Sequence, residues 1–256
     1  MAVGSGNDKG RHGRGARGHP YTDRIDAKIM NSDKQHPGTQ IVAIDGPAGA
    51  GKSSVSRRVA GALGFAFLDT GAMYRTLAWY CLRHQIDVRN ARAVAAACRR
   101  WKATLQCADG QVYLAVDGYY PATEIRSLEV SAVVSHVAAV PKVREWMKKK
   151  QRECLQFGNL VMEGRDIGTN VFPETDFKYY LDAKLEERAR RRAADGLQEN
   201  LAQRDQRDSQ RAVAPLMIAL GAKVINNSQM TPEQTSGTIL ADIRQRLAAA
   251  ARAPDR

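Results

Sequence analysis

A glycine-rich segment near the start of the chain has the residue types and spacing of a phosphate-binding loop. Gly46 is followed after four residues by Gly51, Lys52 and Ser53. An apolar, β-branched run at 41–44 leads in, and apolar residues at helical spacing lead out, which is the strand-to-helix context that makes the pattern specific. The backbone N–H groups of such a loop curl around an oxyanion at a helix N-terminus. Lys52 would then reach the outer phosphates and Ser53 would bind Mg²⁺.

The loop predicts ATP as a co-substrate and Mg²⁺ as a cofactor. An ordinary glycine-rich turn between a strand and a helix is the alternative interpretation, and the flanking elements argue against it. The residues expected to bind ATP are the loop and the first residues of its helix: Gly46, Pro47, Ala48, Gly49, Ala50, Gly51, Lys52, Ser53 and Ser54. A phosphate-binding loop does not by itself say which group receives or uses the phosphoryl group.

Four further motifs, rich in arginine, aspartate and hydroxyl side chains, address that question. They are Asp69-Thr70-Gly71-Ala72-Met73-Tyr74-Arg75, the segment from Ser135 through Pro141 to Arg144, Gly164-Arg165-Asp166-Ile167-Gly168-Thr169, and Arg204-Asp205-Gln206-Arg207-Asp208-Ser209-Gln210-Arg211. Together with the loop, and in this order, they resemble the bacterial cytidylate kinase family. The resemblance covers the chain from residue 40 to residue 250.

The resemblance implies a nucleoside monophosphate kinase that transfers the γ-phosphoryl group of ATP to CMP or dCMP, giving CDP or dCDP and ADP. It implies three catalytic residues: Lys52, Arg165 and Arg204. It also implies nine CMP-binding residues: Thr70, Tyr74, Arg75, Ser135, Arg144, Arg165, Asp166, Asp208 and Arg211.

Roles carry over from the family position by position. Among the CMP-binding residues, the resemblance assigns Arg75, Arg165 and Arg211 to the acceptor phosphate. It assigns Ser135, Arg144 and Asp166 to the base, and Asp208 to the sugar. The resemblance places Arg204 on the donor phosphates from a lid, together with Arg207 or Arg188.

The chemistry of Arg144 and Asp166 suits a cytosine base. Cytosine carries an amino donor at N4 beside acceptors at N3 and O2, so an ionised Asp166 can accept from N4 while Arg144 donates to N3 and O2. Uracil presents the reverse pattern, and both buried side chains would then face like groups. A phosphate monoester, whose second pKa is about 6, is already largely a dianion at neutral pH and needs no general base.

Simpler interpretations stand beside these. Arg165 and Asp166 could form a local ion pair after a strand, and Tyr74 with Arg75 could be a half-buried aromatic and an exposed charge on a helix. Arginines 188 and 190–192 are by default a solvated helix face. Glu163, at the end of a strand near the loop, could contact Mg²⁺ through water.

Alternating strand and helix patterns predict the elements that position these residues. Strands are expected at 41–44, 65–69, 159–163, 177–182 and 223–226, with helices between them and a closing helix at 232–251. Such alternation predicts an α/β fold with a parallel sheet flanked by helices and ligands at the carboxyl ends of the strands. Residues 103–118 alternate in polarity around Asp109-Gly110 and predict an inserted antiparallel subdomain.

The expected organisation is a disordered basic tail at 1–38 and a single kinase domain at 39–252. Within it, segments 39–100, 158–182 and 209–252 form the core, 101–157 the monophosphate-binding insertion and 183–208 an arginine-rich lid. The lid segment is shorter than is usual in the family, so a short helix pair is expected there. Met30 precedes the first strand closely and is an alternative translation start.

Composition limits the function classes. The 256 residues carry a formal net charge of +12 and four cysteines without a C-x-x-C pair, which predicts reduced thiols in a cytoplasmic protein. No stretch resembles a membrane span. We expect small-molecule nucleotides as partners, no specific nucleic acid, no membrane and a monomer.

Two competing functions remain open at this point. One is a kinase of the same fold that acts on UMP or AMP. The other is a P-loop ATPase that binds nucleic acid through its basic segments; the chain lacks an aromatic-interleaved basic stretch that would support it.

Overall fold

The computed structural model describes residues 39–194, 196 and 200–252. All of them belong to one compact unit that spans His36–Arg256. The tail expected at 1–38 lies outside the described residues.

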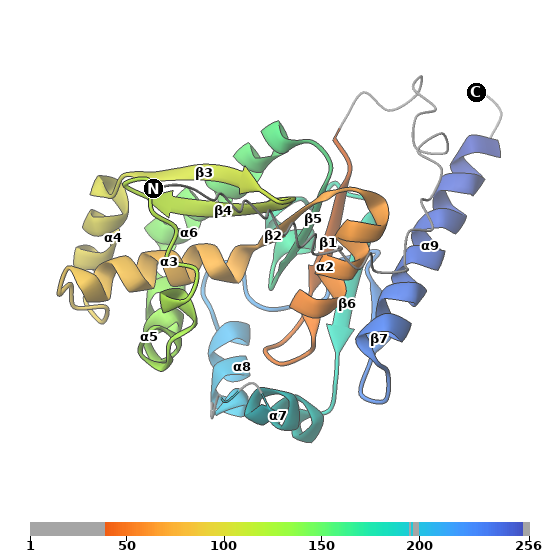
Figure 1. The fold of residues 1–256 in the computed structure, drawn as a ribbon. Helices are drawn as coiled ribbons and strands as arrows, with labels where there is room; N and C mark the ends of the chain where they lie inside the picture. The colour runs from red at the N-terminus through yellow and green to blue at the C-terminus, as the bar shows by residue number, and fades with distance from the viewer. Residues whose placement is uncertain (1–38, 195, 197–199, 253–256) are drawn as a thin grey trace, which may run out of the picture. The chain divides into compact units, whose positions relative to one another are not determined.

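A seven-stranded sheet forms the centre of this unit, with strand order β3-β4-β2-β5-β1-β6-β7 (Figure 1). Every neighbouring pair is parallel except β3 and β4. The strands are β1 (Ile41–Asp45), β2 (Ala66–Asp69), β3 (Ala103–Ala108), β4 (Gln111–Val116), β5 (Leu160–Gly164), β6 (Phe177–Asp182) and β7 (Lys223–Asn226).

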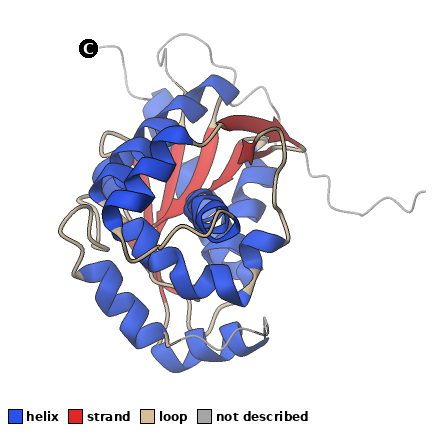
Figure 2. Ribbon diagram, turned by 90° about the vertical axis from the view of Figure 1, so that its left-hand side faces the viewer, coloured by secondary structure: helices blue, strands red, loops and turns tan. Residues whose placement is uncertain are grey.

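Helices pack around the sheet (Figure 2). The α-helices are α2 (Lys52–Leu63), α3 (Thr70–Arg83), α4 (Ala91–Arg100), α5 (Leu128–Ala139), α6 (Pro141–Glu153), α7 (Leu185–Ala194), α8 (Leu201–Ser209) and α9 (Pro232–Arg252). The short helical turns are η1 (Glu124–Arg126), η2 (Cys154–Phe157) and η3 (Ile167–Val171), the last a π-helical turn.

Local sequence signals explain where several helices begin and end. Asp69 caps α3 by accepting from the backbone N–H of Ala72, and Ser127 caps α5 by accepting from Val130. Gly64 ends α2 with a φ angle of 67°. Pro141 occupies the first turn of α6, where its missing N–H costs no hydrogen bond, so the proline divides the helical region into two helices.

The hairpin expected at 103–118 is present and extends the central sheet. Asp109 and Gly110 turn the chain with φ angles of 51° and 70°, and β3 pairs with β4 in antiparallel register. In addition, β4 pairs in parallel with β2 through Phe67 and Leu68. The antiparallel insertion therefore forms one edge of the sheet.

The site is positioned by the carboxyl ends of the central strands. All residues of β1 and β5 are buried, as expected for parallel strands covered on both faces. The register places Asp69 opposite Glu163 and Asp45 opposite Gly164, so three neighbouring strands carry carboxylates at the carboxyl end of the sheet. In Figure 1, β6 points toward α7 and α8, which lie beyond this end. None of the helices in the described part of the chain is long and apolar enough to cross a lipid bilayer.

Candidate active site

The glycine-rich loop joins β1 to α2. Gly46 has a φ angle of 150°, and a Cβ there would lie 2.1 Å from the backbone oxygen of Leu181 on β6. Only glycine therefore fits where the loop leaves the sheet. Gly51, with φ 79°, precedes α2 and makes no side-chain capping bond, which leaves this helix N-terminus open to an anion.

Lys52 is the first residue of α2, and its side chain folds back over the loop. It is 6% exposed, and its Nζ donates to the carbonyl oxygen of Pro47 at 2.8 Å. Burial and the charge of Arg165 lower the pKa of Lys52 to about 7, against the opposing charge of Glu163. The buried ammonium group thus lies among charges of both signs, with Arg204 lowering this pKa and Asp45 raising it.

Ser53 and Glu163 form a second polar pair beside the loop. Burial and the charge of Asp69 raise the pKa of the Glu163 carboxyl to about 7, and the neighbouring Ser53 hydroxyl acts in the opposite direction. Glu163 Oε1 is buried and has no hydrogen-bond partner among the described residues. A hydroxyl beside an unpartnered carboxylate oxygen fits Mg²⁺, which prefers oxygen ligands and retains several waters. The described residues offer no cluster of three His, Cys, Asp or Glu that could hold a metal alone, so phosphate and water would complete the shell.

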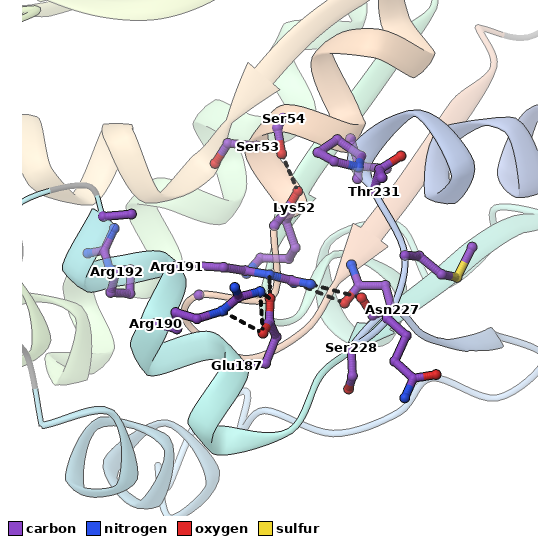
Figure 3. Close-up of a pocket in the computed structure, with 17 residues that line it drawn as sticks. Lys52, Ser53, Ser54, Glu187, Arg190, Arg191, Arg192, Asn227, Ser228 and Thr231 are labelled. Atoms are coloured by element: carbon purple, nitrogen blue, oxygen red, sulfur yellow. Dashed lines mark hydrogen bonds and ion pairs between the residues drawn. The ribbon is translucent and has the colours of Figure 1, made fainter.

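A cavity of about 800 Å³ opens along the loop (Figure 3). Its walls come from the loop and α2, from α7, and from the segment between β7 and α9. Of the predicted ATP-binding residues, Gly49, Gly51, Lys52, Ser53 and Ser54 line it.

Asn227, which the sequence analysis did not select, connects three walls of this cavity. It is 3% exposed, and its Nδ2 donates to the carbonyl oxygen of Ala50 in the loop at 2.9 Å. Arg191 of α7 donates to the Asn227 backbone oxygen at 2.8 Å and is itself held by Glu187, as Figure 3 shows. Its position in the sequence could have indicated this role. Asn227 directly follows β7, at the carboxyl end of the sheet, where ligands bind in parallel sheets.

Arg188 ties the lid to the glycine-rich loop through protein contacts. It is buried, and its Nη1 donates to the carbonyl oxygen of Ala48 at 3.1 Å and to Asp205 of α8 at 2.6 Å. Its Nε donates to the Ala183 carbonyl at 2.9 Å. The default expectation of a solvated arginine is therefore wrong for Arg188.

A second cavity lies beside the first, and all nine predicted CMP-binding residues line it. The open volume of this second cavity is about 60 Å³, which is room for about four water molecules. The full lining is Thr70, Gly71, Tyr74, Arg75, Val134, Ser135, Ala138, Arg144, Gly164, Arg165, Asp166, Arg204, Asp208 and Arg211. These residues come from four separate segments of the chain, which the fold has brought together.

Arg144 and Asp166 form a buried ion pair in this second cavity. Arg144 Nη2 donates to Asp166 Oδ2 at 2.7 Å, and Asn170 donates to the same oxygen at 2.9 Å. The Arg144 guanidinium also lies 5.6 Å from the centre of the Tyr74 ring. Arg144 Nε is buried without a hydrogen-bond partner among the described residues, so this guanidinium retains a donor.

Asp208 gathers two arginines in the same cavity. Its carboxylate accepts from Arg165 Nε at 2.9 Å and from Arg211. Burial opposes ionisation of Asp208, but the charges of Arg165 and Arg211 outweigh it and hold the pKa below its usual value. Arg75 is also buried and donates to Ser131 Oγ at 2.8 Å.

Two predicted residues contact backbone or neighbouring side chains within this cavity. The Thr70 hydroxyl donates to the backbone oxygen of Glu163 at 2.7 Å. Ser135 Oγ accepts from Arg207 at 3.4 Å. Thr70 therefore supports the segment that carries Arg165 and Asp166.

The arginines predicted for the donor phosphates, Arg188, Arg204 and Arg207, are not among the described residues that line the first cavity. Arg204 lines the second cavity, and its charge reaches Lys52, while Arg207 contacts Ser135 and Arg188 contacts the loop backbone. The lid arginines that line the first cavity are Arg190, Arg191 and Arg192. The reason is geometric, since α7 faces the glycine-rich loop and α8 contacts α5 of the insertion.

Comparisons with known proteins agree with the sequence motifs. The profile of the family described as cytidylate kinase matches residues 42–245. A bifunctional pantoate ligase/cytidylate kinase of Acaryochloris marina is 47% identical over 76% of this chain, and the chain spans only 40% of that protein. A cytidylate kinase of Caldanaerobacter subterraneus is 41% identical over 81% of this chain and 96% of its own length. A cytidylate kinase of Anoxybacillus flavithermus is 39% identical over 80% of this chain and 96% of its own length.

Proposed function

This chain belongs to the cytidylate kinase family, and we propose that it transfers the γ-phosphoryl group of ATP to CMP or dCMP, giving CDP or dCDP and ADP. One observation supports this proposal above the others. A cavity along a phosphate-binding loop adjoins a second cavity that combines several arginines with the Arg144–Asp166 pair. The first suits a triphosphate, and the second suits a monophosphate attached to a polar base.

We assign the acceptor phosphate to Arg75, Arg165 and Arg211. Asp208 pairs with both Arg165 and Arg211 within the cavity. Guanidinium groups match phosphate geometry with paired N–H donors. An incoming phosphate dianion would replace the carboxylate as their partner, and Asp208 could then accept from a sugar hydroxyl.

Recognition of the base is assigned to Arg144, Asp166 and Ser135. The buried Asp166 carboxylate would accept from the cytosine amino group, and Arg144 would donate to N3 and O2. The unpartnered Nε of Arg144 supports this assignment, because a buried donor without a partner is costly unless a ligand satisfies it. Asn170 and Ala138 hold the pair in place through Asp166 Oδ2 and Arg144 Nη1.

The transfer step requires alignment and charge neutralisation. Lys52 would contact the transferred group, and its pKa is lowered by burial together with the charges of Arg165 and Arg204. Ser53 would hold Mg²⁺, with Glu163 acting through water; the metal would neutralise charge on the β- and γ-phosphates. The acceptor dianion needs no side chain to remove a proton.

Arg204 is assigned to the junction between donor and acceptor. It lines the acceptor cavity, and its charge also acts on Lys52 and Asp208. A guanidinium in that place can stabilise the transferring phosphoryl group from the donor side or from the acceptor side.

We propose that the acceptor cavity widens as the nucleotide enters. Its open volume of about 60 Å³ holds a few waters only. Asp208, which pairs with Arg165 and Arg211, belongs to α8, so a shift of α8 would release the arginines and widen the cavity. Closure of α8 over bound CMP would then exclude water from the transferring phosphoryl group.

The proposal is tested by an assay of ADP formation with ATP, Mg²⁺ and a panel of CMP, dCMP, UMP and AMP. We expect CMP or dCMP to give the highest kcat/KM by at least two orders of magnitude over AMP. A preference for UMP or AMP would assign a different acceptor to the same fold. ATP hydrolysis stimulated by single-stranded nucleic acid, with no transfer to any monophosphate, would overturn the kinase proposal.

A further inference from the structure

Asp45 is a buried carboxylate that no step of the proposed reaction uses. It is the last residue of β1, directly before Gly46 of the phosphate-binding loop, and is 4% exposed. Its Oδ1 accepts from the backbone N–H of Ile167 at 2.9 Å, and its Oδ2 accepts from that of Gly168 at 2.8 Å. Both oxygens therefore bind the segment that directly follows Arg165 and Asp166.

This contact links the two halves of the site across more than a hundred residues of sequence. Ile167 and Gly168 begin the π-helical turn η3, and the first N–H groups of a helical turn have no partner within the turn. Asp45 satisfies two of them from the strand that carries the donor loop. A neutral or apolar side chain of similar size could fill the space but could not accept both hydrogen bonds.

The opposite side of the same segment is fixed as well. Thr70 donates to the backbone oxygen of Glu163 at 2.7 Å, and Asp45 lies opposite Gly164 in the β1–β5 register. A Cβ on Gly164 would lie 2.7 Å from Thr70 Oγ1 and 2.8 Å from a side-chain carbon of Ile167. Backbone hydrogen bonds and close packing thus bracket Arg165 and Asp166 on both sides.

We infer that Asp45 is a positioning residue, which sets the place of Arg165 and Asp166 relative to the donor loop before the acceptor binds. The inference rests on the proposed function for the identity of the acceptor. Asp45 acts through the 165–168 backbone: it aligns the phosphate-binding guanidinium and the base-reading carboxylate with the loop. An uncompensated carboxylate in the interior is strongly unfavourable. The two hydrogen bonds to the 167–168 backbone offset the cost of burying Asp45.

The test substitutes Asp45→Asn, which keeps the shape but turns one acceptor oxygen into an amino group that faces a backbone N–H. We expect the KM for CMP to rise at least tenfold and the CMP:UMP ratio of kcat/KM to fall at least tenfold. The Kd of ATP, measured by calorimetry, should stay within threefold of wild type. Asp242→Asn is the matched control, because Asp242 is a largely buried carboxylate on α9 with hydrogen bonds to Tyr179 and Lys223; it should alter Tm alone.

An Asp45→Asn variant with a lowered Tm but an unchanged KM for CMP and an unchanged CMP:UMP ratio would overturn the inference, because Asp45 would then serve stability alone. If the variant does not fold, hydrogen exchange on the wild-type protein decides. We expect the amides of Ile167 and Gly168 to be protected without any nucleotide. Rapid exchange that slows only on CMP addition would overturn the inference. A wild-type enzyme without preference for CMP would instead contradict the proposed function, and the exchange result would still stand.

Discussion

At the scale of single residues, Lys52 is the side chain on which we expect the proposed phosphoryl transfer to depend most. It is buried, and among the described residues its ammonium group donates one hydrogen bond, to the Pro47 carbonyl, so its removal takes away charge more than packing. We predict that Lys52→Ala lowers kcat by about 100- to 1,000-fold, since a preorganised transition-state contact is typically worth about 3–4 kcal/mol. The measurement is a steady-state assay with ATP and CMP on the purified variant.

Lys142→Ala is the matched control for that measurement. Lys142 is exposed on α6, where it pairs with Glu145, and its loss should leave kcat unchanged. Circular dichroism and thermal melting should show that both variants are folded. Near-normal kcat in a folded Lys52→Ala protein would contradict the assignment of the loop.

The lowered pKa of Lys52 predicts a link between ATP binding and protons. Burial and Arg165 lower this pKa to about 7 in the free protein, and the negative charge of a bound triphosphate should raise it again. The protonated, binding-competent amine is thus present below pH 7 and is lost as the pH rises above it. We predict that ATP affinity weakens between pH 7 and pH 9 and that binding at pH 8 takes up protons.

Calorimetry in buffers of different ionisation enthalpy measures this proton uptake directly. Lys52→Arg keeps its charge over the whole range and should lose most of the uptake. Glu163→Gln is the second comparison, because the Glu163 carboxyl, with a pKa raised to about 7, also titrates beside the loop. Proton release on ATP binding to the wild-type protein would contradict the prediction.

At the scale of elements, α8 and the residues just after it supply three side chains of the second cavity, to which we assign the acceptor. Arg204 and Asp208 lie on α8, and Arg211 follows it. We predict that Arg211→Ala raises the KM for CMP by at least tenfold, because a hydrogen bond to a charged group is worth about 1.5–3 kcal/mol. Arg204→Ala should lower kcat as well, since Arg204 acts on both Lys52 and the acceptor cavity.

Initial rates over a grid of ATP and CMP concentrations separate these effects. Arg92→Ala changes an exposed arginine of α4 and should leave kcat and the KM values unchanged. An Arg204→Ala variant with kcat and both KM values of wild type would show that α8 does not serve the transferring group.

The elements themselves were predictable to a large extent, and the reasons are local. Hydrophobic periodicity, Pro141, Gly64 and the Asp109-Gly110 turn each act within a few residues, and the helices and strands follow them. The parallel pairing of β4 with β2 was not predictable, because it depends on contacts between segments far apart in sequence. The place of Arg204 on the wall of the second cavity has the same origin.

At the scale of the whole molecule, the motifs predicted which side chains gather but not how they hold one another. The second cavity unites all nine predicted CMP-binding residues, whereas their roles stay predictions. Asn227 and Asp45 escaped the sequence analysis because their partners, Ala50 and the 167–168 amides, are backbone groups. A sequence pattern cannot indicate such contacts, because the partner is a backbone group and not a particular side chain.

The most direct test of the proposed activity is the ratio of kcat/KM for CMP to that for UMP, measured in wild type and in Asp166→Asn. We predict a strong preference for CMP in the wild-type enzyme and a much smaller ratio in the variant, because an amide can present either a donor or an acceptor where a carboxylate presents only acceptors. Loss of activity on both nucleotides with an unchanged ratio would contradict the reading of cytosine by Arg144 and Asp166.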